Sequence, residues 1–176
     1  RYVGGIVVRT FGHEDAEAFA TWASVPVING LSALHHPCQA VADALTIHER
    51  FGRLRGVTVA YVGDGNNVLH SLMEACGMLG AHLRVATPPR YRPDRALWAE
   101  GTARAKRHGA TLVWYDDPRD AARGAQVLYT DVWASMGQEH ERAARVKAFR
   151  PFQINAGLLK LAARTAIVLH CLPAHR

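Results

Sequence analysis

The sequence has few cysteines and no long hydrophobic run. Its 176 residues include three cysteines, Cys38, Cys76 and Cys171, and none of them forms a CxxC pair. An odd number of widely separated cysteines argues against a disulfide framework and a structural zinc site, and favours a reducing compartment, which we expect to be the cytoplasm. Because no apolar run approaches the roughly 18 residues that span a bilayer, we expect no membrane partner.

Patterns typical of metal or nucleic-acid binding are also missing. The ten histidines form no HExxH motif and no clustered Cys/His spacing, so we expect no metal. The net charge of +6 comes from basic residues spread over predicted helices and mixed with glutamates, without a basic stripe interleaved with aromatics. We therefore expect no nucleic-acid partner, whereas a small anionic substrate would suit the charge.

What the sequence does contain is an alternation of short β-rich runs and longer helical stretches. Strands are predicted at residues 2–9, 25–28, 57–62, 82–86, 111–115, 126–130, 152–155 and 167–170. Helices are predicted at residues 14–23, 38–51, 68–79, 93–107, 139–149 and 156–163. This alternation predicts an α/β fold, a Rossmann-like doubly wound parallel sheet preceded by the tail of a second α/β domain.

A polar, glycine-bounded break at residues 52–56 precedes the strongest strand pattern and marks the start of a complete domain. We accordingly predict the end of a first domain at residues 1–34, an interdomain helix at 35–52 and a second domain at 53–176.

Polar residues follow several predicted strands, at the edge where open α/β sheets bind ligands. Cys171 stands between His170 and Leu172 at the end of the last strand, where it is either a reactive thiol or a core cysteine. Asp131 could bind a substrate ammonium group or cap a helix, and Arg9 could clamp an anion or lie on the surface. Each residue thus has a functional and a structural interpretation.

Two helix starts carry further candidates. Gly63-Asp64-Gly65-Asn66-Asn67 resembles a dinucleotide fingerprint, but a valine stands where a small residue should follow; its two amides can hold a carboxylate or cap the helix. His36 and Gln39 lie three apart, so that an imidazole and an amide can address one carbonyl or carbamoyl group. A solvent-facing helix start is the alternative for this pair.

Taken in this order, the segments resemble the aspartate/ornithine carbamoyltransferase family. The matching runs are Arg9 after its strand, Val25-Pro26-Val27-Ile28-Asn29-Gly30-Leu31, His36-Pro37-Cys38-Gln39, Gly63-Asp64-Gly65-Asn66-Asn67, Asp131 through Ser135-Met136-Gly137, and His170-Cys171-Leu172-Pro173. The last two runs are typical of the ornithine branch. The resemblance covers essentially the whole chain. It implies transfer of a carbamoyl group from carbamoyl phosphate to the δ-amine of ornithine, giving citrulline and phosphate for arginine biosynthesis, without a cofactor.

The resemblance also implies the site residues. Carbamoyl phosphate would be bound by Arg9 of the first domain and by His36 and Gln39 of the interdomain helix. Cys171 and Leu172, at the end of the second domain, would also contact it. Ornithine would be bound by the second domain, through Asn67, Asp131, Ser135 and Met136. The residues that would take part in the chemistry are Cys171, Asp131 and His36. The family further implies a homo-oligomer, a trimer.

Two family features are not in this sequence. It contains no Ser-Thr-Arg-Thr phosphate loop, and it does not continue past the His-Cys-Leu-Pro segment to a further substrate-binding arginine and helix. We therefore expect a fragment that is inactive alone. The alternatives are a carbamoyltransferase for another amine, such as putrescine or lysine, a Rossmann-type nucleotide-binding module, and a non-catalytic paralogue with the same fold.

Overall fold

The computed structural model describes residues 2–134 and 139–174. The first half contains β1 (Ile6–Arg9), α1 (His13–Trp22), β2 (Val27–Leu31), α2 (Pro37–Phe51), β3 (Thr58–Val62), α3 (Asn67–Leu79) and β4 (His82–Ala86). The second half contains the 3-10 turn η1 (Pro89–Tyr91), α4 (Arg95–Arg107), β5 (Leu112–Tyr115), α5 (Pro118–Ala122), β6 (Val127–Thr130), η2 (Glu139–Glu141), α6 (Arg142–Phe149), α7 (Ala156–Leu159) and β7 (Ile167–His170). No helix in these described ranges is long and apolar enough to cross a membrane.

Five parallel strands form the main sheet, in the order β5-β4-β3-β6-β7. The chain builds outward from β3 to β5 and then returns to the other side of β3 with β6 and β7. This reversal creates a topological switch point between β3 and β6. In open α/β sheets, ligands bind beyond the carboxyl ends of the strands at such a point.

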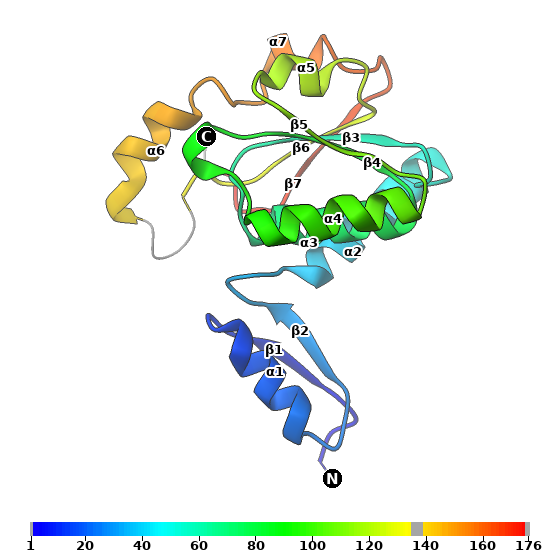
Figure 1. Cartoon of the computed structure of the whole chain (residues 1–176), viewed down its shortest axis with the longest axis vertical. Coiled ribbons are helices and arrows are strands. Elements are labelled where there is room, and N and C mark those ends of the chain that lie inside the picture. Colours follow the sequence, from blue (N-terminus) through cyan, green and yellow to red (C-terminus); the bar gives the residue numbers. More distant parts are fainter. Residues whose placement is uncertain (1, 135–138, 175–176) are drawn as a thin grey trace.

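Helices cover both faces of this sheet (Figure 1). Because strand side chains alternate between faces, Val59 and Tyr61 of β3 enter one core and Ala60 and Val62 enter the other. The first core packs against α2, α3 and α4, and the second against α5, α6 and α7. The predicted doubly wound α/β fold is confirmed.

Capping residues set the helix boundaries. Polar side chains accept hydrogen bonds from first-turn N–H groups at the starts of α3, α4, α5 and α7: Asn66, Asp94, Asp117 and Asn155. Helices α2 and α3 end at Gly52 and Gly80, in the left-handed conformation that glycine adopts without a steric penalty.

The β1–α1–β2 segment forms a smaller unit set apart from the main sheet, on the far side of α2 and α3 (Figure 1). β1 and β2 pair in parallel. Hydrogen bonds join the segment between β2 and α2 to helix α3, because Asn67 Nδ2 donates to the Ser32 carbonyl at 2.7 Å and the His36 N–H donates to Ser71 Oγ at 2.8 Å. The small unit is therefore anchored to the helix that starts at the switch point.

The structure differs from the sequence prediction in three places. The strand predicted at residues 152–155 is wrong, because the Phe152 N–H closes a turn onto the Phe149 carbonyl at 2.7 Å, and Phe152 is buried by helix packing. Helix α5 was not predicted. Asn29 and Gly30, read as the approach to a turn, lie inside β2.

Candidate active site

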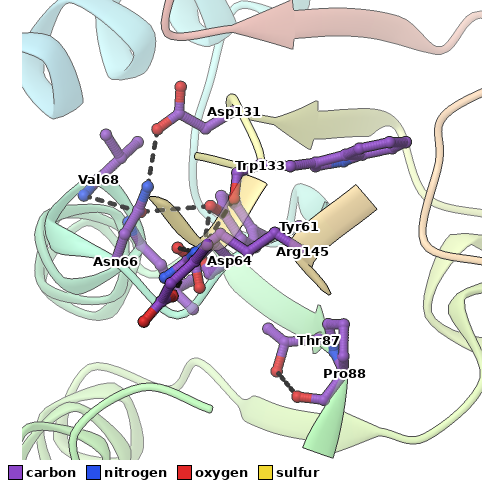
Figure 2. A network of polar contacts seen from close by, with 11 residues as sticks. Tyr61, Asp64, Asn66, Val68, Thr87, Pro88, Asp131, Trp133 and Arg145 are labelled. Atoms are coloured by element: carbon purple, nitrogen blue, oxygen red, sulfur yellow. Dashed lines mark hydrogen bonds and ion pairs between the residues drawn. The ribbon is translucent and has the colours of Figure 1, made fainter. Parts of the chain in front are cut away.

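Two polar side chains meet at the switch point. Asn66 caps α3 after the β3 turn, and Asp131 follows β6. The Asn66 Nδ2 group donates to Asp131 Oδ2 at 2.8 Å, while Asn66 Oδ1 accepts from the N–H groups of Val68 and Leu69 (Figure 2). One amide thus starts the helix and fixes a carboxylate that is only 7% exposed.

A buried ion pair holds the turn between β3 and α3. Arg145 Nη1 of α6 lies 2.8 Å from Asp64 Oδ2, and the same guanidinium bonds the Trp133 carbonyl at 3.0 Å and Glu141 at 3.0 Å (Figure 2). Burial raises the pKa of Asp64, and the Arg145 charge opposes that rise. The pair therefore ties the segment after β6 to the turn after β3, so that both sides of the switch point keep their relative position.

Gly65 belongs to this turn for a reason unrelated to nucleotide binding. Its N–H donates to the Tyr91 carbonyl at 2.9 Å, and a Cβ atom would lie 2.3 Å from Pro93 N and 2.6 Å from the Tyr91 oxygen. The glycine thus admits the chain's own backbone where a dinucleotide fingerprint would admit a pyrophosphate. Val68 is buried in the core, and β4 runs into Thr87 without an acidic residue. These observations argue against the nucleotide-binding alternative.

The start of α2 carries His36 and Gln39. His36 is the N-cap residue, and its Nδ1 atom is buried with no hydrogen-bond partner among residues 2–134 and 139–174. Burial, and then the charge of Arg9, lower the pKa of His36, so its imidazole is neutral at pH 7 and can donate one hydrogen bond. Gln39 Nε2 donates to Asp43 Oδ1 at 3.0 Å.

Cys171 follows β7 and is partly buried. Burial raises the pKa of its thiol to about 12; Asp131 and Asp43 add to the rise, and Arg9 opposes it. The thiol is therefore protonated at neutral pH, which suits a hydrogen-bond donor and does not suit a thiolate nucleophile. The charges of Asp131 and Arg9 thus both act on the Cys171 thiol, in opposite directions.

The remaining predicted residues stand as follows. Leu172 adopts a left-handed backbone with φ of 49°, and its N–H donates to His170 Nδ1 at 2.8 Å. Asn67 is engaged with the Ser32 carbonyl. Ser135 and Met136 lie outside the described residues.

The sequence analysis pointed to both amides of the Asn66-Asn67 pair but gave the ornithine role to Asn67, and it did not select Asp43. The available signals were the helix-capping position of Asn66 and the four-residue spacing that puts Asp43 one helical turn after Gln39.

The described ranges also contain a small pocket between α3 and α4, lined by His35, His70, Glu74 and Arg104 among others. It includes none of the predicted site residues. Within the same ranges, no group of three His, Cys, Asp or Glu side chains is arranged to hold a metal ion.

Sequence comparisons match the whole length of the chain. The family model described as aspartate/ornithine carbamoyltransferase, Asp/Orn binding domain, matches residues 55–176, and that of the carbamoyl-P binding domain matches residues 1–49. The chain is 57% identical over 176 residues to an ornithine carbamoyltransferase of Acidothermus cellulolyticus and 55% identical to one of Gloeobacter violaceus. All of this chain is aligned in both comparisons, but it spans only 56% of each relative.

Solved structures agree with these matches. The fold superposes on the ornithine carbamoyltransferase from Pyrococcus furiosus with a TM-score of 0.95 and 52% identity, covering 99% of this chain and 56% of that one. For the enzyme from Gloeobacter violaceus the TM-score is 0.90 at 51% identity, with 99% and 58% covered. Two domain matches in succession and identities above 50% leave no other family to consider, and the chain belongs to the aspartate/ornithine carbamoyltransferase family.

Proposed function

We propose that this chain forms the ornithine site and part of the carbamoyl phosphate site of an ornithine carbamoyltransferase. The observation that carries the proposal is the identity of 50–57% to relatives of that name, over the whole chain. The electrostatics around the switch point support it, because a buried carboxylate, a protonated thiol and a neutral imidazole suit attack by an amine on a carbonyl group.

In the proposed reaction the δ-amine nitrogen of ornithine attacks the carbamoyl carbon. The new C–N bond replaces the C–O bond to phosphate, which leaves with the bonding electrons as inorganic phosphate, and the nitrogen loses a proton. Since alkylamines have a pKa of about 10.4 in water, the site must favour the neutral amine. We assign His36 and Arg9 to the carbonyl oxygen, which gains negative charge in the transition state. Arg9 also binds the phosphate.

The other assignments follow the same proposal. Gln39 and the backbone of Cys171 and Leu172 bind the carbamoyl amine. Asp131 binds the amino acid and handles protons with Cys171, and the ornithine contacts are completed by Asn67, Ser135 and Met136. We further propose that the enzyme is a trimer in the cytoplasm and acts in arginine biosynthesis; three free cysteines suit that compartment.

The test uses a chimera in which this chain replaces the matching segment of the Gloeobacter violaceus enzyme, hereafter the Gloeobacter chimera. We expect it to form citrulline from carbamoyl phosphate and ornithine. Asp131→Asn should raise the KM for ornithine at least tenfold, because a hydrogen bond to a charged group is worth about 1.5–3 kcal/mol, and should change the KM for carbamoyl phosphate far less. Faster carbamoylation of putrescine or lysine would favour the other-amine alternative, and no turnover would favour a non-catalytic paralogue.

A further inference from the structure

Asp43 is a buried carboxylate that the sequence motifs do not explain. It lies in α2, one turn after Gln39, and is only 6% exposed. Burial raises the pKa of this carboxyl group, so its charge is costly at this position. Two donors compensate that cost. Tyr129 OH donates to Oδ2 at 2.6 Å and Gln39 Nε2 donates to Oδ1 at 3.0 Å.

The two donors differ in freedom. Tyr129 is fully buried at the end of β6, and its ring stacks on Tyr61 with 5.8 Å between centroids. Burial and Asp43 raise the pKa of Tyr129, so its hydroxyl stays protonated and can only donate to the carboxylate. Asp43 is thereby fixed from the core side. Gln39 lies on the other side, toward the region of His36.

This arrangement determines which way the Gln39 amide faces. A glutamine amide has an NH2 group that donates and an oxygen that accepts, and either can be exchanged for the other by a flip. Because an ionised carboxylate only accepts, Asp43 selects the NH2 group. The oxygen Oε1 is then the polar atom that Gln39 offers to a ligand, and it can accept an N–H bond from a carbamoyl amine.

We propose that Asp43 is a positioning residue that fixes Gln39 with its amide oxygen toward the carbamoyl donor. The proposal rests on the proposed function, because it specifies how Gln39 reads the amine end of carbamoyl phosphate. Asp43 itself does not touch the substrate in this role. Without Asp43, the Gln39 amide could bind either a donor or an acceptor of the ligand. With Asp43, it offers only its oxygen and binds a donor.

Asp43→Asn in the Gloeobacter chimera tests this orientation. The buried Tyr129 hydroxyl has no other acceptor among the described residues, so the new amide keeps its oxygen toward Tyr129 and turns its NH2 group to Gln39. Two donors then face each other, Gln39 flips, and its NH2 group meets the carbamoyl amine. We expect the KM for carbamoyl phosphate to rise about tenfold or more, with a change of less than threefold in the KM for ornithine.

The exchange variant Gln39→Glu/Asp43→Asn separates orientation from stability. The new amide at position 43 donates its NH2 group to one oxygen of the new carboxylate at position 39, and the other oxygen faces the carbamoyl amine as in the unmodified protein. We expect the exchange variant to lower the KM for carbamoyl phosphate at least threefold relative to Asp43→Asn. Gln39→Glu alone brings two carboxylates together, so it should have the highest KM for carbamoyl phosphate of the three variants. Asp94→Asn is the matched control, because Asn and Asp cap helices equally and Asp94 is exposed at the start of α4; it should leave both KM values unchanged.

A second readout does not depend on activity. In the ¹⁵N-labelled chain, the side-chain amide signal that disappears in Gln39→Glu identifies Gln39, and one of its protons should exchange slowly with solvent. Asp43→Asn should abolish this protection. An exchange variant no better than Asp43→Asn, equal rises in both KM values, or an unprotected Gln39 amide would each overturn the proposal. A chimera without citrulline formation but with a protected amide would instead count against the proposed function.

Discussion

Replacing Asn66 by aspartate should destabilise the protein through Asp131 alone. Aspartate caps helices as well as asparagine does, so the bonds to the N–H groups of Val68 and Leu69 are retained. The Nδ2 donor that lies 2.8 Å from Asp131 Oδ2 is lost, and a second carboxylate oxygen takes its place. A hydrogen bond to a charged group contributes about 1.5–3 kcal/mol, and repulsion between two largely buried carboxylates adds to its loss.

We therefore expect Asn66→Asp to lower the free energy of unfolding at pH 8 by about 2–4 kcal/mol. With a urea m-value of about 2 kcal/mol/M, the midpoint should fall by roughly 1–2 M. The assay is urea unfolding of the chain followed by circular dichroism. Asn155→Asp is the matched control, because Asn155 caps α7 through the Leu158 N–H and is exposed. Its midpoint should barely move.

The effect should depend on pH in a defined direction. A carboxylate beside Asp131 raises the folded-state pKa of one member of the pair above its unfolded value of about 3.9. The folded variant then binds more protons than the unfolded chain, so stability falls as pH rises through the raised pKa. The loss at pH 8 should shrink on acidification to pH 5, where a shared proton restores a hydrogen bond. If Asn66→Asp costs no more than Asn155→Asp at pH 8, Asn66 is only a helix cap and the reasoning is refuted.

Two further predictions concern the turn after β3 and the thiol after β7. Gly65→Ala should lower the free energy of unfolding by about 1–3 kcal/mol, because its Cβ would meet the backbone of residues 91–93; Gly4→Ala, with no atom within 4 Å, is the control, and equal urea midpoints would contradict the prediction. Cys171 should react slowly with iodoacetamide at pH 7, and its rate should keep rising beyond pH 10, because its pKa is raised to about 12. Mass spectrometry with Cys171→Ser as reference measures this rate, and a plateau below pH 9 would contradict it.

The sequence pattern predicted the elements of the main sheet closely. The predicted strands at 82–86 and 167–170 have the bounds of β4 and β7, because buried parallel strands are short, continuous apolar runs between breaks. The failure at residues 152–155 has a physical cause. Phe152 and Ile154 are apolar because they pack under α6 and α7, and periodicity cannot distinguish such a turn from a strand.

The candidate site was less accessible from the sequence. The predicted strand ends put Asp131 and the Asn66-Asn67 pair near the switch point, because the carboxyl ends of parallel strands lie at one edge of the sheet. Which of two adjacent amides faces Asp131 depends on the local backbone, and the structure gives this contact to Asn66. Helical spacing alone could have predicted the contact of Gln39 with Asp43, four residues later. The second contact of Asp43, with Tyr129, joins residues 86 positions apart, so it can be known only from the folded structure.

The most direct test of the account is where ornithine binds. A crystal structure of the Gloeobacter chimera soaked with L-ornithine should show the amino acid beyond the carboxyl ends of β3 and β6. One of its ammonium groups should lie about 3 Å from an Asp131 carboxylate oxygen. Ornithine bound elsewhere, for example in the α3–α4 pocket beside His35, with Asp131 still bonded only to Asn66, would contradict the account.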